Sequence, residues 1–185
     1  MITRSLFQSL LPPLSKTVLV LTLGLCNLTS LVVAAEIPVE LNVDWNFVQG
    51  AEYPGAEGSV EPGTAENTMV LSYDFSGGGQ YVAAAKSVEP EGELTGLELT
   101  ASGPGGNLGV ALVDNTDQTF IYRLGMLEDA EKTFDPALGK PSASYGGAND
   151  KTLHFPIKAI RLIVEKSPAL PEGKITVSKI ILRTP

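Results

Sequence analysis

From residue 36 onward, the chain alternates short apolar and polar runs, with clusters of Gly, Pro, Asn and Asp between them. No stretch longer than about three helical turns keeps a helical period, so the pattern predicts strands rather than helices. Each expected strand has one apolar face, which indicates an all-β fold in which two antiparallel sheets pack into a β-sandwich. The expected strands are residues 38–43, 68–75, 80–88, 94–101, 107–114, 119–126, 157–166 and 174–182.

The stretch 69–88 predicts a hairpin around a glycine-rich loop at residues 76–80. A turn centred on Gly78 places large residues opposite small ones on one face, as a packed face requires. The pairs are Phe75 with Tyr81, Tyr73 with Ala83, and Leu71 with Ala85. We therefore expect this face to belong to the core, and the face that carries Val82, Ala84 and Lys86 to meet solvent or a ligand.

A second hairpin is predicted around the turn 114–118. Centring the turn on Thr116 pairs apolar residues on one face, namely Leu112 with Phe120, Val110 with Tyr122, and Leu108 with Leu124. The opposite face places Arg123 beside Gly109, over a shallow floor where its donors can meet hydroxyls or a carboxylate. The alternative is a solvated arginine that pairs with a neighbouring carboxylate.

The remaining strand patterns indicate scaffold. In 157–166, Ile160, Leu162 and Val164 are expected to point inward. In the last strand the alternation slips near Ser178 and Lys179, which predicts a β-bulge. The segment 49–67, rich in Gly, Pro and Glu, is expected to be a long surface loop, and no internal repeat or second domain boundary is evident.

Residues 1–35 have the three parts of a secretory signal: a weakly basic lead, an apolar run over 17–33, and small residues before Glu36. We expect cleavage there, with an uncleaved membrane anchor as the alternative. The only cysteine, Cys26, lies inside this signal, and Leu25 before it argues against lipid attachment. The mature chain then has no disulfide, and we expect a single β-sandwich domain over 36–185, exported to the bacterial periplasm or secreted.

Residues 36–185 contain 11 basic and 21 acidic residues, a net charge of −10. Such an acidic surface repels phosphate backbones and anionic lipids. Nucleic acid is therefore not an expected partner, nor is a membrane after signal cleavage.

The loop 144–150 has the residue types of a sugar site. Its glycines allow a sharp turn that could present Tyr145 for stacking, while Asn149 and Asp150 offer donors and acceptors for hydroxyls. The alternative is an ordinary turn in which Asn149 and Asp150 bond their own backbone. The only tryptophan, Trp45, could stack on a sugar or plug one end of the sandwich with its indole N–H on a backbone carbonyl.

Four stretches together resemble the galactose-binding-like jelly-roll modules found beside bacterial glycoside hydrolases: residues 73–82, 114–124, 146–150 and 160–168. The resemblance implies a jelly-roll fold and carbohydrate binding. The chain departs from the family in two places: Tyr145 stands where such modules often have tryptophan, and Ser178–Lys179 replaces acidic residues of the last strand. The second change argues against a structural calcium ion, so we expect no cofactor, and the identity of any metal site is left unknown.

A catalytic role is not expected. The single histidine, His154, lies between apolar residues, and nothing beside it suggests a nucleophile; paired carboxylates of a small glycan-processing enzyme remain an alternative. We expect a non-catalytic carbohydrate-binding protein that uses Tyr145 for stacking and four polar residues for hydroxyls, namely Asn149, Asp150, Arg123 and Gln118. A separate glycoside hydrolase or an envelope protein is a further expected partner. The rival hypothesis is a structural or protein-interaction subunit of the cell envelope.

Overall fold

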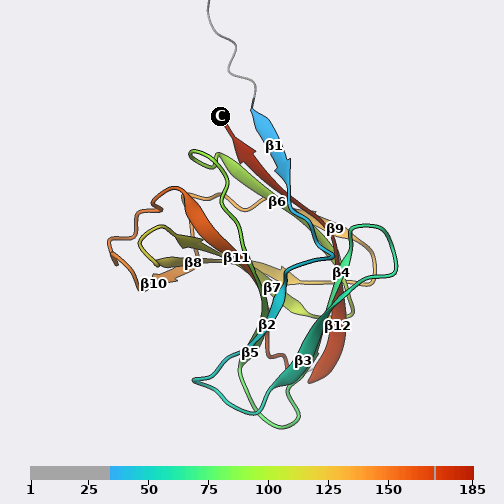
Figure 1. The fold of residues 1–185 in the computed structure, drawn as a ribbon. Helices are drawn as coiled ribbons and strands as arrows, with labels where there is room; N and C mark the ends of the chain where they lie inside the picture. Colours follow the sequence, from blue (N-terminus) through green and yellow to red (C-terminus); the bar gives the residue numbers. More distant parts are fainter. Residues whose placement is uncertain (1–33, 169) are drawn as a thin grey trace, which may run out of the picture. The chain divides into compact units, whose positions relative to one another are not determined.

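A computed structural model describes residues 34–168 and 170–185 of the chain, and Figure 1 shows them as two packed layers of strands. Within this part of the chain, no helix is long and apolar enough to cross a membrane. The twelve strands are β1 (Ala35–Pro38), β2 (Asn46–Gln49), β3 (Glu57–Pro62), β4 (Met69–Asp74), β5 (Tyr81–Ser87), β6 (Gly96–Ser102), β7 (Asn107–Asp114), β8 (Thr119–Met126), β9 (Lys132–Phe134), β10 (Ala143–Tyr145), β11 (Ile157–Glu165) and β12 (Glu172–Thr184).

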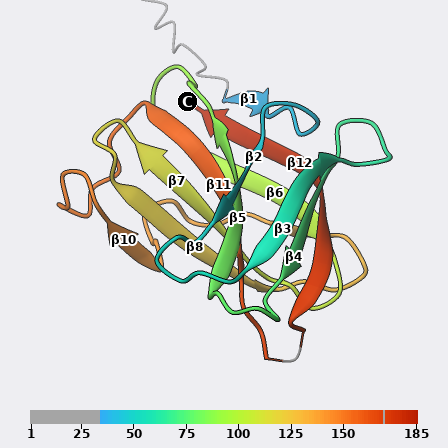
Figure 2. The same ribbon diagram turned by 60° about the horizontal axis from the view of Figure 1, so that its bottom comes forward.

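The strands form two antiparallel sheets of six, which we call sheet A and sheet B. Sheet A has the order β3-β4-β12-β6-β9, and β1 also pairs with β12. Sheet B has the order β10-β8-β7-β11-β5-β2. Figure 2 shows the strands of sheet B running from β10 at one edge to β2 at the other. The expected all-β, two-sheet antiparallel sandwich is confirmed.

The core lies between the two sheets and follows the period-two alternation of the sequence. In β4 every second side chain is buried, and in β11 Ile160, Leu162 and Val164 are buried as expected. The largest fully buried side chains include Phe75 and Phe120. Burying such side chains contributes about 1.5–3 kcal/mol each to folding, which allows the domain to fold without a disulfide.

Trp45 closes one part of this core. Its ring packs against the buried cluster, and its Nε1 donates a 3.1 Å hydrogen bond to the Glu40 carbonyl. Trp45 therefore plugs one end of the sandwich, which was one of its two expected roles, rather than presenting its ring for a sugar to stack on.

The predicted hairpin over 69–88 is wrong. β4 pairs with β3 and β12 in sheet A, whereas β5 pairs with β2 and β11 in sheet B, so the glycine loop crosses from one sheet to the other. Gly78 and Gly79 have φ values of 127° and 80°, and an added Cβ would clash with the Pro54 carbonyl oxygen at Gly78 and with Ala56 at Gly79. In β5, consequently, Val82 and Ala84 face the core, and Tyr81 and Ala83 belong to the outer face.

Several boundaries also differ from the expectation. The segment 49–67 is not only a loop, because it contains β3, which forms an edge of sheet A. The first expected strand, 38–43, is replaced by β1, which ends at Pro38. The short strands β2, β9 and β10 were not predicted, because runs of three or four residues carry too little alternation to be recognised.

The hairpin of β7 and β8 has the predicted register over most of its length. Leu112 pairs with Phe120 and Gly109 with Arg123, but Leu108 pairs with Gly125 instead of Leu124 because a register shift intervenes. The predicted bulge in the last strand is confirmed by the register shift between Val177 and Lys179.

Candidate functional site

A cleft of about 550 Å³ lies on the outer face of sheet B. Three tyrosines and five charged side chains line it, over a floor of small and branched residues. Its lining residues are Val48, Glu52, Tyr53, Gln80, Tyr81, Ala83, Ile121, Arg123, Tyr145, Arg161, Ile163, Glu165 and Lys166.

The strand register explains the hollow. One cross-strand row places Ile163 in the middle, with Ala83 and Val48 on one side and Gly109 and Arg123 on the other. Ala83 and Gly109 project little or nothing above the sheet, so the longer side chains at the ends of the row become walls. Ala83 and Ile163 of this floor form a small buried apolar cluster with Ala111.

The three tyrosines come from different parts of the chain. Tyr81 lies at the start of β5, Tyr145 at the end of β10, and Tyr53 in the loop between β2 and β3. The Tyr53 and Tyr145 side chains are about half exposed, at 49% and 50%. Large half-exposed rings on the walls of a cleft are suited to stacking against a flat ligand surface.

Tyr81 is held by a neighbour. Its Oη donates a 2.7 Å hydrogen bond to Glu52 Oε1. Burial raises the pKa of Tyr81 to about 12, and the bond to Glu52 adds to the increase, while the nearby positive charge of Arg161 opposes it. The pKa of Glu52 is lowered by a backbone hydrogen bond and then by the Tyr81 bond. At neutral pH the pair is therefore a neutral phenol and a carboxylate.

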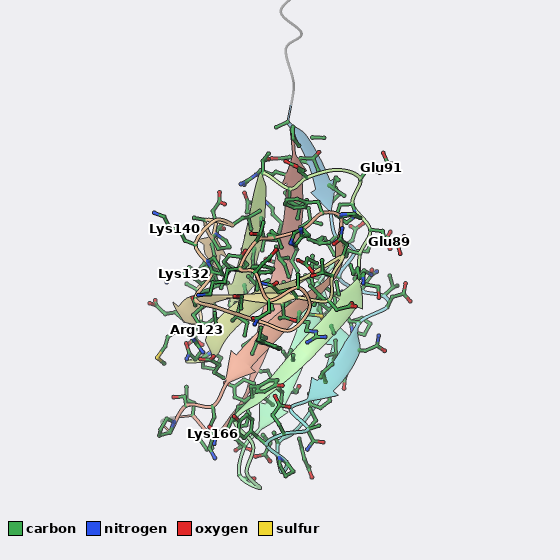
Figure 3. All side chains as sticks on the ribbon, turned by 90° about the vertical axis from the view of Figure 1, so that its left-hand side faces the viewer. Glu89, Glu91, Arg123, Lys132, Lys140 and Lys166 are labelled. Carbon is green, nitrogen blue, oxygen red and sulfur yellow. The ribbon has the colours of Figure 1, made fainter. Side chains whose placement is uncertain are left out.

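The cationic side chains differ in their partners. Arg123 Nε donates to Glu165 Oε1 at 2.9 Å, and Glu165 also accepts a 3.3 Å bond from Asn107. Arg123 thus lines the cleft and pairs with a neighbouring carboxylate, as the alternative interpretation expected, and its contact with a sugar stays a prediction. Figure 3 shows Lys166 below Arg123, with Lys132 and Lys140 above it.

The loop that follows Tyr145 is positioned by the turn at residues 114–118. The buried Asp114 carboxylate accepts hydrogen bonds from the Thr116 backbone at 2.8 Å, the Thr116 hydroxyl at 2.7 Å and the Gln118 backbone at 3.0 Å, and a fourth from the His154 backbone at 3.1 Å. Thr116 Oγ1 in turn accepts a 3.2 Å bond from the Ala148 backbone. Burial alone would raise the pKa of Asp114, but these hydrogen bonds outweigh it and lower the pKa.

Of the site residues expected from the sequence, the structure brings Arg123 and Tyr145 together in the cleft. Gln118 is fully buried, and its Oε1 accepts a 3.2 Å bond from the Asp150 backbone, which leaves it no surface for a sugar. Asp150 Oδ1 accepts from the Thr152 backbone at 2.9 Å, and Asp150 Oδ2 lies 2.8 Å from His154 Nε2. These bonds, the backbone one first, lower the pKa of Asp150.

Asn149 adopts a φ of 53°, and its backbone N–H donates to Gly146 at 3.1 Å. The Asp150 carboxylate thus makes the backbone bond of the ordinary turn that was the alternative for this loop, and neither Asn149 nor Asp150 lines the cleft. The sequence interpretation is therefore corrected for Gln118, which supports the loop after Tyr145 from a buried position, while sugar contacts by Asn149 and Asp150 stay predictions.

Sequence reasoning missed Glu52, Tyr53, Tyr81 and Arg161 as cleft residues. Tyr81 was placed in the core by the wrong hairpin, and Arg161 was seen only as an outward residue of a scaffold strand. The alternation that buries Leu162 does point Arg161 outward, but only the pairing of β11 with β5 and β7 shows that it points into a cleft.

Among residues 34–168 and 170–185, no three His, Cys, Asp or Glu side chains gather in an arrangement that could hold a metal ion. The bulge at Lys179 places that lysine 3.1 Å from Glu98, as an ion pair. The charged side chains at this bulge therefore pair with each other.

No protein-family model matches the sequence, and no curated protein matches it. Solved structures do match. A family 11 carbohydrate-binding module from Clostridium thermocellum, in complex with a β-1,3-1,4-mixed-linked tetrasaccharide, is 16% identical with a TM-score of 0.60, over 80% of this chain and 94% of that chain.

A family 29 carbohydrate-binding module complexed with mannohexaose is 11% identical with a TM-score of 0.50, over 83% of this chain and 94% of that chain. The agarase AgWH50C is also 11% identical with a TM-score of 0.50, over 81% of this chain but 24% of that chain. The chain therefore has the jelly-roll sandwich fold of these carbohydrate-binding modules, as the resemblance implied.

Proposed function

We propose that this protein binds an oligosaccharide or polysaccharide in the cleft of sheet B and does not cleave it. The observation that carries the proposal is the set of three tyrosines on the walls of a cleft whose floor is made of small residues. Sugar rings have an apolar face that stacks on aromatic rings and a rim of hydroxyls that need hydrogen bonds. A cleft with both kinds of group fits them.

In this account Tyr53 and Tyr145 supply the exposed stacking surfaces, and Tyr81 supplies a third, fixed ring. Arg123 donates to hydroxyls with the guanidinium nitrogens that Glu165 leaves free, since only its Nε is bonded to that carboxylate. Glu52 and Glu165 offer acceptor oxygens. We expect modest affinity, because an open cleft leaves part of the sugar hydrated and each ordered side chain costs entropy.

The absence of cleavage is part of the proposal. Glycoside hydrolysis needs one carboxylic acid kept protonated near neutral pH and a second carboxylate beside it. In the cleft, the pKa of Glu52 is lowered rather than raised, and Glu165 is paired with Arg123. Neither residue has the surroundings of a general acid.

Two of the matched structures are carbohydrate-binding modules whose bound ligands are a mixed-linked tetrasaccharide and mannohexaose. They support the class of ligand for this fold but do not identify the sugar here, because a shared fold does not carry a shared function.

We further propose that residues 1–35 direct export, so that the protein meets glycans in the periplasm or outside the cell, alone or with a separate glycoside hydrolase or envelope protein. Export predicts a mature N-terminus at Glu36 in the periplasmic or medium fraction. N-terminal sequencing of the fractionated protein tests this, and an intact N-terminus in the cytoplasm would contradict it.

The experiment for binding is a glycan panel screened by affinity electrophoresis and followed by calorimetry. The purified protein should bind at least one glycan, and Tyr145→Ala should weaken that binding about two- to tenfold, since stacking contributes about 0.5–1.5 kcal/mol. Tyr145→Phe keeps the ring and serves as the matched control. Binding to no glycan would contradict the proposal, and release of reducing sugar would show an enzyme instead.

A further inference from the structure

Arg161 has an unusual position for a charged residue. It lies near the middle of β11, with Ala85 opposite it on β5 and Ala111 opposite it on β7. Along its own strand, the next residues on the same face are Ala159 and Ile163. Cross-strand neighbours are the usual source of a partner for a charge on a sheet, and here none of them has a polar side chain.

The other charged groups of the cleft do not compensate for this. Glu52 accepts the Tyr81 hydroxyl, and Glu165 is bonded to Arg123 and Asn107. In the part of the chain that the structure describes, Arg161 makes neither an ion pair nor a side-chain hydrogen bond. The cleft has three cations and two carboxylates, an excess of positive charge on a domain whose net charge is −10.

A half-buried, unpaired guanidinium is costly, because it loses part of its hydration without gaining a partner. The cost is removed when a ligand brings an anion. A guanidinium presents its donors as a planar fork that matches a carboxylate or a sulfate with two parallel bonds, and such charge-assisted bonds are stronger than neutral ones.

We propose that the cleft selects an anionic glycan, and that the Arg161 guanidinium pairs with a carboxylate or sulfate group on a sugar ring lying in the cleft beside Ala83 and Ile163. The proposal rests on the function proposed above and adds the charge of the ligand. Lys166, exposed at the end of β11 and on the cleft wall, would attract the same chain at longer range.

The test compares charged glycans with their neutral counterparts. The probes are oligogalacturonate, alginate oligomers and a sulfated galactan, each beside the same glycan after carboxyl reduction or desulfation. Comparing the carboxylate-bearing probes with the sulfated galactan shows which of the two anionic groups the protein binds. The purified protein should bind at least one charged probe about tenfold or more tightly than its neutral counterpart, and added salt should weaken that binding.

Arg161→Gln removes the charge and the guanidinium fork and keeps a shorter polar side chain. It should lower affinity for the charged probe about tenfold or more and leave affinity for the neutral counterpart unchanged. Arg161→Lys keeps the positive charge but lacks the planar guanidinium fork, so its loss of affinity for the charged probe should be intermediate. Lys140→Gln is the matched control, because it removes one positive charge at an exposed position outside the cleft and should change nothing.

Melting temperatures show whether each variant is folded, and the salt dependence of the unmodified protein tests the proposal if Arg161→Gln fails to fold. Binding of neutral glycans alone, with Arg161→Gln unaffected, would overturn the anionic preference and leave the carbohydrate function standing. Equal losses in Arg161→Gln and Lys140→Gln would also overturn it, since they would reflect net charge only. Binding to no probe and to no glycan of the wider panel would remove both proposals.

Discussion

The Tyr81 hydroxyl donates a 2.7 Å hydrogen bond to Glu52, and this bond ties β5 to the loop that carries Tyr53. The loop passes close to the same ring at Gly50, where an added Cβ would lie 2.8 Å from Tyr81 Cε1. One tyrosine of the cleft therefore holds the segment that positions another.

Tyr81→Phe keeps the ring and removes this bond. We expect glycan affinity to fall two- to tenfold, because a hydrogen bond contributes about 0.5–1.5 kcal/mol and the loop with Tyr53 becomes less ordered. Calorimetry measures the affinity, and amide hydrogen exchange of residues 50–56 measures the order of the loop. Unchanged exchange together with unchanged affinity would show that the bond positions nothing.

Gly147→Ala should displace the loop that carries Tyr145. Gly147 has a φ of 51°, and an added Cβ would lie 2.2 Å from the Gln118 backbone nitrogen. We expect a loss of about 1–3 kcal/mol in the free energy of unfolding, measured by urea denaturation, and weaker glycan binding. Gly139→Ala is the control, because nothing lies within 4 Å of its added Cβ. Equal stability of the two variants would contradict this role for Gly147.

Asp114→Asn should destabilise the protein by about 1–3 kcal/mol at neutral pH, since an amide NH₂ would face one of the N–H donors that the carboxylate now accepts. The pKa of Asp114 is lowered in the folded state, so its contribution is fully present above its ordinary value of 3.8 and is lost as pH falls through the lower folded value. Urea denaturation from pH 7 to pH 3 should therefore show that the difference in free energy of unfolding between the unmodified protein and Asp114→Asn becomes smaller toward pH 3.

Asp129→Asn, at an exposed position, is the control for this series and should change stability by less than about 0.5 kcal/mol. A deficit for Asp114→Asn that stays constant down to pH 3 would mean that the carboxylate charge is not what holds the turn.

Arg123→Ala should separate binding from stability. Its ion pair with Glu165 joins side chains that are 53% and 30% exposed, and exposed pairs contribute about 0–1 kcal/mol. We expect little change in the free energy of unfolding but a clear loss of glycan affinity. A variant that unfolds readily while binding normally would assign Arg123 to the scaffold.

The fold class could be predicted from the sequence because burial in a sandwich imposes a period of two on each strand. The β7–β8 hairpin was predicted with nearly its true register, since its strands are joined by a short turn that fixes which residues face each other. A β-bulge still shifted the last pair, because Leu124 of β8 is an extra residue between the partners of Gly109 and Leu108.

The pairing of β4 and β5 could not be predicted in the same way. Their connection is as short as that of a hairpin, but it passes between sheets, and the choice depends on the long-range partners β12 and β11. Because the two strands were predicted to form a hairpin, Tyr81 was assigned to the core, whereas it lines the cleft. Arg161 was missed for a related reason. The alternation in β11 shows that Arg161 points outward, but only the pairing of β11 with β5 and β7 places it at a cleft.

The claim that the outer face of sheet B is the binding surface is tested most directly by a chemical-shift titration of the ¹⁵N-labelled protein with a glycan that it binds. We predict that the shifted amides gather on the cleft strands, around Ala83, Arg123 and Ile163. Amides on the outer face of sheet A, such as Ser72 and Thr176, should not move. Shifts confined to sheet A, or spread evenly over both sheets, would contradict this account.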